Sequence, residues 1–190
     1  MKKLNYTDIN SQQLVDIRSQ HDYQSGHVDQ SLNLNPKNFK KYAHQFLSVN
    51  EPIIFIGEDE NELEDVYSSA QDMGFKVLEG YLKLSDVPTE ELKKTETISA
   101  ETFLDKTDDY ILLDVRHPNE ITRPAPENNL INIALEDLSK EYSKLDENKT
   151  VYTLCGSGNR GTSAASFLEN KGYKTTVIEG GMKAVQEVTQ

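Results

Sequence analysis

The chain has 190 residues, and 20 Lys and Arg face 32 Asp and Glu, which gives a formal net charge of −12. A molecule with this charge repels phosphate backbones and anionic lipid headgroups unless it carries a basic patch. The sequence contains no such patch, so we expect no nucleic-acid and no membrane partner. Its apolar runs are also far shorter than the roughly 18–20 residues that span a bilayer. A single cysteine excludes an intramolecular disulfide, and the start of the chain lacks an apolar signal core, so we expect a cytoplasmic protein.

The sequence repeats itself at an offset of 98 residues. A segment ending in Asp-Ile-Arg recurs as one ending in Asp-Val-Arg, and an apolar run and a Gly-aromatic-Lys segment recur at the same offset. The matched segments are 14–18 with 112–116, 53–57 with 151–155, and 73–76 with 171–174. Such internal similarity indicates two copies of one domain. We therefore expect a first domain at 1–84, a polar linker at 85–97 and a second domain at 98–190.

Each copy shows the same alternation of apolar strands and amphipathic helices. In chain order, the first copy has a strand ending at Asp16, a helix, a buried strand over 53–56, a second helix and a short strand, and the second copy repeats this order around a strand at 151–154. The apolar helix faces are Phe39, Ala43, Phe46 and Leu47; Leu63, Val66, Ala70 and Met73; and Leu138, Tyr142 and Leu145. This pattern predicts an α/β fold in which each domain has a mostly parallel sheet with helices on both faces. Ligands in such folds bind beyond the carboxyl ends of the strands, where Gly57 and Cys155 fall.

The loop at 155–160, Cys-Gly-Ser-Gly-Asn-Arg, lies between a predicted strand and a predicted helix. Its glycines allow the backbone to turn so that successive N–H groups point inwards and bind an anion. The N-terminus of the following helix adds partial positive charge, and both effects favour the thiolate of Cys155 over the thiol. We expect Cys155 to be a catalytic nucleophile, and the alternative is a buried structural thiol. The residues expected to bind the anionic substrate are Gly156, Ser157, Gly158, Asn159 and Arg160.

Other polar residues have less specific interpretations. Asp114 and Arg116, at a strand end, either support the site or form a structural ion pair that includes Glu120. Arg123 either recruits an anionic donor or is solvated surface. The histidines and the cysteine show no metal-ligand spacing, so we expect no metal and no cofactor.

Taken together, these motifs resemble those of tandem rhodanese domains, which are sulfurtransferases. The loop at 155–160 is similar to the six-residue rhodanese active loop Cys-x-x-Gly-x-Arg, and the segments 112–116, 132–135 and 177–181 and the residue Glu120 are also rhodanese-like. The resemblance implies that Cys155 attacks the outer sulfur of thiosulfate or a thiol persulfide and holds it as a persulfide. It then passes the sulfur to a nucleophilic acceptor such as sulfite, cyanide or a thiol.

The first copy departs from this pattern at the catalytic loop. Gly57 stands at the cysteine position and Glu62 at the position of Arg160, and the loop 57–62 contains four carboxylates. We interpret this copy as a silent pseudo-rhodanese, and its acidic loop as a solvated helix start or a docking surface. The second copy departs as well, because 121–127 replaces the usual Gly-His-Ile segment that walls the pocket.

A silent copy followed by an active one resembles the C-terminal half of CstB-type fusions, in which a persulfide dioxygenase precedes both domains. This closer resemblance implies a fused or partner persulfide dioxygenase and a role in sulfide and persulfide metabolism. Two other functions remain open. One is a non-enzymatic persulfide-sensing or protein-docking module. The other is a cysteine-dependent phosphatase or arsenate reductase, which the loop disfavours because four residues, rather than five, separate Cys155 from Arg160.

Overall fold

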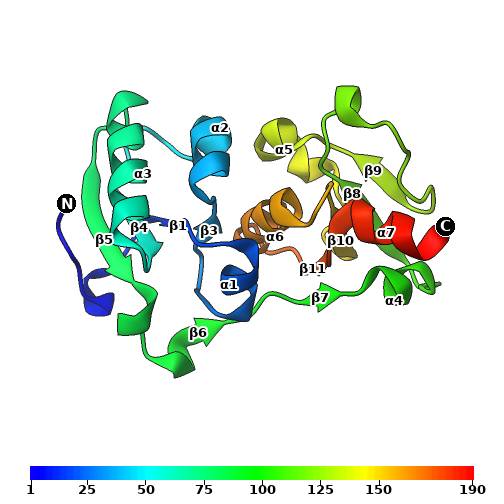
Figure 1. Cartoon of the computed structure of the whole chain (residues 1–190), viewed down its shortest axis with the longest axis horizontal. Coiled ribbons are helices and arrows are strands. Elements are labelled where there is room, and N and C mark those ends of the chain that lie inside the picture. The colour runs from blue at the N-terminus through cyan, green and yellow to red at the C-terminus, as the bar shows by residue number, and fades with distance from the viewer. The chain divides into compact units, whose positions relative to one another are not determined.

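The computed structural model describes all residues from 1 to 190. The chain divides into two compact units, Met1–Lys94 and Thr95–Gln190 (Figure 1). The first unit contains η1 (Tyr6–Asp8), β1 (Gln13–Asp16), α1 (Gln20–Ser25), β2 (His27–Val28), β3 (Leu32–Asn33), α2 (Pro36–Phe46), β4 (Ile53–Gly57), α3 (Glu60–Asp72), β5 (Leu78–Lys83), η2 (Leu84–Asp86), η3 (Thr89–Glu91) and β6 (Leu92–Lys93).

The second unit follows a similar order of strands and helices. It contains β7 (Thr97–Ile98), α4 (Ala100–Leu104), β8 (Tyr110–Asp114), η4 (Pro118–Glu120), β9 (Leu130–Asn132), α5 (Leu135–Glu141), η5 (Tyr142–Lys144), β10 (Thr150–Leu154), α6 (Asn159–Asn170), β11 (Thr175–Ile178) and α7 (Gly181–Thr189). Here η marks a 3-10 helix.

Both units are built on parallel sheets. The strand order is β3-β1-β4-β5 in the first unit and β7-β11-β10-β8-β9 in the second, and every pair in these two sheets is parallel. Only the small ladder of β2 with β6 is antiparallel. The predicted α/β fold, with two mostly parallel sheets flanked by helices, is therefore confirmed.

In the first unit, β4 is an inner strand that is buried on both faces, because its side chains alternate between two apolar layers. Phe55 packs edge-on against Phe39 of α2 and Tyr67 of α3, two helices that lie side by side in Figure 1. Ile54 and Ile56 point the other way, into a core that also holds Leu14 and Leu82 of β1 and β5. The predicted helix faces agree in part. Phe39, Ala43, Leu63, Val66 and Ala70 are fully buried, whereas Phe46, Leu47 and Met73 are half-buried.

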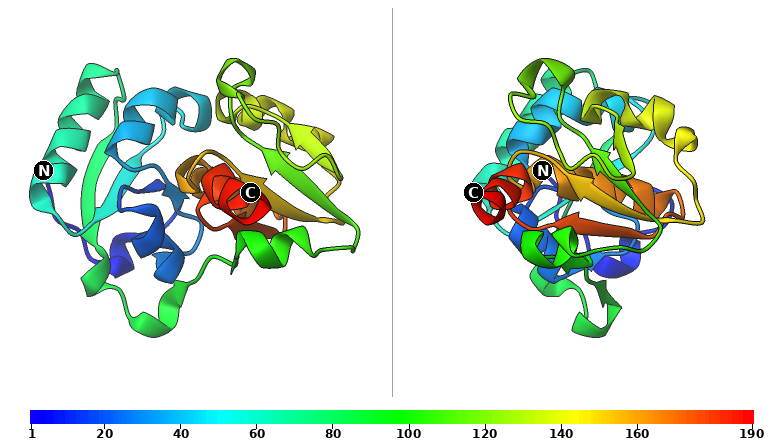
Figure 2. Two further views of the ribbon diagram at one scale, coloured as in Figure 1. Left: turned by 45° about the vertical axis from the view of Figure 1, so that its right-hand side comes forward. Right: turned by 90° about the vertical axis from the view of Figure 1, so that its right-hand side faces the viewer.

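The second unit repeats this arrangement around β10. Tyr152 and Leu154 pack with Phe103 of α4 and with Met182 and Val185 of α7. On the opposite face α6 packs on β10 and β11, and α5 packs on α6. Figure 2 shows α7 on one side of this sheet and α5 on the other. The sheet thus fixes where β10 ends, at Leu154, and the next residue is Cys155.

Two details refine the expectations from the sequence. The predicted helix that includes Tyr142 is shorter than its apolar pattern indicates, because α5 ends at Glu141 and the chain continues as a 3-10 turn. Residues 85–97, expected to form a linker, include β6, which pairs with β2, and Thr97, the first residue of β7, which pairs with β11.

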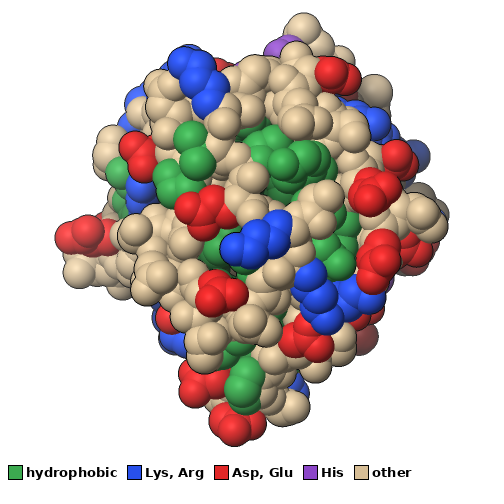
Figure 3. All heavy atoms as spheres, turned by 90° about the vertical axis from the view of Figure 1, so that its left-hand side faces the viewer, with side chains coloured by type: hydrophobic (Ala, Val, Ile, Leu, Met, Phe, Trp, Pro, Cys, Tyr) green, Lys and Arg blue, Asp and Glu red, His purple; other side chains and the backbone are tan.

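None of the helices has the length and apolar character that crossing a lipid bilayer requires. Figure 3 shows the side of the first unit that carries α3 and β5. Acidic and basic side chains are interspersed on this face rather than gathered into a basic patch.

His27 is a buried titratable group in the first unit. Its ring stacks on Tyr23 with the centroids 4.0 Å apart, and its Nδ1 lies 2.9 Å from the carbonyl oxygen of Tyr23. Burial lowers the pKa of His27 below its ordinary value of 6.5. The unfolded chain therefore binds this proton more readily than the folded chain. The contribution of His27 to stability is fully present above pH 6.5 and decreases as the pH falls below that value.

Replacing His27 by Phe keeps an aromatic ring on Tyr23 and removes the titration. We expect the melting temperature of His27→Phe to fall less than that of the wild type between pH 7.5 and pH 5.5. Thermal melting followed by circular dichroism measures this difference. His44→Phe is the matched control, because His44 also stacks on an aromatic ring, that of Phe75, but is exposed. An unchanged pH dependence in His27→Phe would contradict the prediction.

Candidate active site

Cys155 lies at the carboxyl end of the second unit's sheet. It directly follows β10, which lies between β8 and β11, and only 1% of its surface is exposed. The backbone N–H groups of Gly158 and Gly161 donate to its Sγ atom at 3.1 and 3.3 Å. The loop thus directs two N–H groups at the sulfur, an arrangement that stabilises negative charge there.

The first turn of α7 stabilises the conformation of the loop through backbone hydrogen bonds. The N–H groups of Met182 and Lys183 donate to the carbonyl oxygens of Cys155 and Gly156, at 2.7 and 3.1 Å. Gly181 lies so close that a Cβ atom on it would be 2.4 Å from the Cys155 carbonyl oxygen, and its φ of +59° is in the left-handed region. The resemblance found in the sequence covered 177–181 but gave this segment no role in holding the loop. The signal that could have indicated such a role was the pair of glycines that follows a strand.

The remaining loop residues form the start of α6. Gly158 caps the helix in the left-handed conformation, with φ of +92°, and Asn159 is the first helical residue. Ser157 is exposed. The side chain of Arg160 forms an ion pair with Glu120. The cation of the loop is therefore paired with a carboxylate from η4.

Asp114 and Arg116 form a buried ion pair. The guanidinium of Arg116 donates to both carboxylate oxygens of Asp114, through Nε at 3.0 and 3.1 Å and through Nη2 at 2.7 Å. The side chain of Asn132 donates to the backbone carbonyls of both residues, at 2.7 and 3.0 Å. Glu120 bonds instead to Arg160 and to the N–H of His117. The Asp114–Arg116 ion pair is therefore present but does not include Glu120, which contacts the loop at 155–160 instead.

The first unit contains the same cluster without the cysteine. Arg18 donates to both carboxylate oxygens of Asp16, and Asn33 donates to the carbonyls of Asp16 and Arg18 at 3.2 and 3.1 Å. Because the copy without a nucleophile keeps this cluster, its geometry favours a structural role at the end of the strand.

In the first unit, neighbouring side chains fill the space at the position that corresponds to Cys155. Gly57 is buried at the end of β4, and a Cβ atom there would lie 3.1 Å from side-chain atoms of both Ile17 and Leu63. Leu63 occupies the place of Gly161 at the repeat offset. The carboxylate of Asp59 accepts the N–H groups of Asn61 and Glu62, at 2.8 and 3.0 Å. The N–H groups at the start of α3 are therefore already bonded to an anion within the chain.

Two further features bear on the expected ligands. The side chain of Arg123 is exposed, and its backbone carbonyl accepts a hydrogen bond from Arg116, so its expected role in recruiting a donor stays a prediction. The structure contains no group of three or more His, Cys, Asp or Glu side chains placed to hold a metal ion.

The arrangement is that of two parallel α/β domains, one with a cysteine in a glycine-rich loop at the end of a central strand. The model of the rhodanese-like domain matches residues 2–83 and 99–188. The chain therefore belongs to the rhodanese-like family and carries two copies of its domain.

Comparison with individual proteins agrees with this family. A Bacillus subtilis protein named as a candidate sulfurtransferase, YtwF, is 28% identical over 53% of this chain and 96% of its own length. A Bacillus subtilis protein named as a candidate sulfur carrier, YrkF, is 32% identical over 45% of this chain and 48% of its own. A rhodanese-related protein from Thermoplasma volcanium has 30% identity and a TM-score of 0.46, over 49% of this chain and 92% of that one. The family match and the similarity to YtwF support sulfur transfer as the general class of activity.

The close approach of Gly181 to the loop predicts a large cost for Gly181→Ala. Gly172→Ala is the matched control, because Gly172 also has a positive φ, of +88°, but nothing lies within 4 Å of a Cβ placed there. We expect Gly172→Ala to lower the free energy of unfolding by about 1 kcal/mol, and Gly181→Ala to lower it by roughly 1–3 kcal/mol more. Urea denaturation measures both, and equal losses would contradict the prediction.

Proposed function

We propose that the second domain transfers sulfane sulfur through Cys155, from thiosulfate or a thiol persulfide to a nucleophilic acceptor such as sulfite, cyanide or a thiol. The observation that carries this proposal is the pair of N–H groups, from Gly158 and Gly161, that donate to Sγ of Cys155 in a rhodanese-like loop. Such donors stabilise negative charge that develops at the sulfur, and the attacking form of a cysteine is its thiolate.

The chemistry has two balanced steps. The Cys155 thiolate attacks the outer sulfur of the donor, and the S–S bond of the donor breaks. The leaving group, sulfite from thiosulfate or a thiolate from a persulfide, takes the electron pair. Cys155 then carries a terminal sulfur with a negative charge. In the second step the acceptor attacks that sulfur, the new S–S bond breaks, and the Cys155 thiolate is released with its electron pair.

The loop supports both steps through charge. The intermediate and the departing thiolate are anions, and N–H groups that already point at the site stabilise them without rearranging. The expected contacts of Gly156, Ser157 and Asn159 with the substrate belong to this proposal. Arg160 contributes a cation that Glu120 holds in the absence of substrate, so an anionic donor competes with the Glu120 carboxylate for it.

The first domain is proposed to be catalytically silent. Its nucleophile position is a glycine, and Leu63 and Ile17 fill the neighbouring space. A silent domain before an active one supports the closer resemblance to the C-terminal half of CstB-type fusions. The implied partner is a fused or separate persulfide dioxygenase, and the implied setting is sulfide and persulfide metabolism in the cytoplasm.

A second candidate function is a non-enzymatic sensor, in which Cys155 is modified by persulfide without passing the sulfur on. The burial of Cys155, at 1% exposure, is the observation that favours it, because access for an acceptor is narrow. Acceptor-dependent turnover distinguishes the two functions.

The first test is intact mass spectrometry of the reduced chain after brief exposure to thiosulfate or to glutathione persulfide. We expect one added sulfur in the wild type and none in Cys155→Ser, because the cysteine is the only thiol in the chain. Cyanide or sulfite should remove the added sulfur. Failure of both donors to add sulfur would overturn the proposal, and addition without removal by any acceptor would favour the sensor.

A second test introduces a cysteine into the silent domain. We expect Gly57→Cys, in the Cys155→Ser background, to acquire no sulfur from either donor. The new side chain would press on Ile17 and Leu63, and the Asp59 carboxylate already holds the N–H groups at the start of α3. The same mass measurement applies, with the wild type as the positive control. Sulfur on the introduced cysteine would show that the loss of the nucleophile alone silenced this domain.

A further inference from the structure

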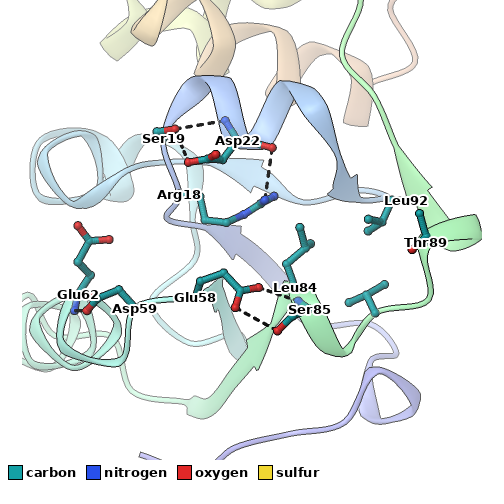
Figure 4. Close-up of a pocket in the computed structure, with 11 residues that line it drawn as sticks. Arg18, Ser19, Asp22, Glu58, Asp59, Glu62, Leu84, Ser85, Thr89 and Leu92 are labelled. Atoms are coloured by element: carbon teal, nitrogen blue, oxygen red, sulfur yellow. Dashed lines mark hydrogen bonds between the residues drawn. The ribbon is translucent and has the colours of Figure 1, made fainter.

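The first unit contains a cavity of about 670 Å³ at the carboxyl ends of its strands (Figure 4). Its walls come from three segments that each follow a strand of the parallel sheet, namely the chain after β1, after β4 and after β5. The lining residues are Arg18, Ser19, Asp22, Glu58, Asp59, Glu62, Leu84, Ser85, Val87, Thr89 and Leu92. By the internal repeat, Glu58, Asp59 and Glu62 stand where the second domain has Gly156, Ser157 and Arg160. The silent domain thus retains a cavity where the active domain has its catalytic loop.

The lining of the cavity has a charged part and an apolar part that are not fully separate. In Figure 4, Asp59 and Glu62 lie at one end and Leu92 lies toward the other, whereas Glu58 lies beside Leu84. Asp22 lies beside Ser19, apart from Glu62. Val87 is buried and adds to the apolar wall. A ligand that fits both parts therefore needs a charged group and an apolar body.

The one cation in the lining does not neutralise the carboxylates. The guanidinium of Arg18 donates to both oxygens of the buried Asp16, and to the backbone carbonyls of Asp22 and Gly26. Its charge is thus paired with Asp16, which is outside the lining. The four lining carboxylates leave the cavity with a negative potential, which attracts cations and repels anions.

The carboxylates differ in how far they are already engaged. Both oxygens of Glu58 accept hydrogen bonds from Ser85, and Asp59 caps α3. Asp22 accepts one hydrogen bond, from the Ser19 hydroxyl, at 2.6 Å. Glu62 is exposed on the first turn of α3. Glu62 and Asp22 therefore have the greatest capacity to accept hydrogen bonds from a ligand.

We propose that this cavity binds a primary ammonium group on an aliphatic stem, with the ammonium attracted by the lining carboxylates, of which Glu62 and Asp22 are the least engaged, and the stem against Leu84, Val87 and Leu92. The volume is many times that of a single ion, and the apolar wall favours an organic cation over a small inorganic one. An ammonium supplies three donors and no acceptor, so it matches a site whose charged groups are acceptors. The same chemistry comes from a free aliphatic amine or from a lysine side chain of a polypeptide. The proposal is independent of sulfur transfer by Cys155.

The test uses the full chain and isothermal titration calorimetry at low ionic strength. One arm titrates 1-aminopentane, a second titrates a short peptide with a single central lysine, and pentanoate is the anionic control. We expect saturable binding of at least one cation, none of pentanoate, and weaker binding as salt is added. Binding of the amine alone assigns the site to a small amine, and binding of the peptide alone assigns it to a lysine side chain.

Variants locate the binding. We expect Glu62→Gln to weaken the affinity about tenfold, because it removes a charge-assisted hydrogen bond. Glu64→Gln is the matched control, since Glu64 is exposed on the same helix but does not line the cavity. Asp22→Asn is a second variant that keeps the shape of the side chain, and Cys155→Ser should bind as the wild type does. No saturable binding of either cation, or equal binding by Glu62→Gln and Glu64→Gln, would overturn the proposal.

Discussion

The loop at 155–160 depends on the close approach of two backbone segments at the carboxyl end of β10. The first turn of α7 donates N–H groups to the carbonyls of Cys155 and Gly156, and this contact leaves no room for a side chain at Gly181. With the start of the loop held in this way, the chain turns through Gly158 and its N–H groups point back at the sulfur. The loop cannot relax without leaving the carbonyl of the buried Cys155 unpaired, which is costly. The electrostatic character of the site is thus a consequence of packing between a loop and a helix.

The two domains show how far the same framework can diverge. Both keep the buried Asp-Arg pair at the end of the first long strand, and both keep an asparagine that holds the carbonyls of that pair. In the first domain, however, β5 continues as a strand to Lys83, whereas the second domain turns into α7 soon after β11. The loop 57–62 therefore lacks the helix that holds loop 155–160. In the second domain, N–H groups of the loop point at Cys155. In the first domain, which has a strand in place of that helix, the corresponding loop contributes carboxylates to a cavity.

The sequence predicted the features that depend on local chemistry and on repetition. The offset of 98 residues revealed the two copies, and the alternation of apolar strands and helices gave the parallel sheets. The glycines around Cys155 indicated that N–H groups would point at the sulfur, as Gly158 and Gly161 do. These inferences succeed because periodicity acts over a few neighbouring residues. Of the loop glycines, only Gly158 takes the left-handed conformation, and Gly161 points its N–H at the sulfur from the first turn of α6.

Contacts between distant segments needed the tertiary structure. Glu120 is 40 residues from Arg160 in the sequence, and its pairing with the loop rather than with Arg116 depends on where η4 lies. The sequence showed that Gly57 is no nucleophile, but not that Leu63 fills the space beside it. The sequence also showed that the loop 57–62 is acidic. It did not show that an apolar wall stands beside this loop and makes the loop one side of a cavity. The sequence thus determined the number of domains, their fold class and the place of Cys155 directly after a central strand. Only the tertiary structure decided what surrounds each strand end, because those surroundings are built from segments that the sheet brings together from far apart in the chain.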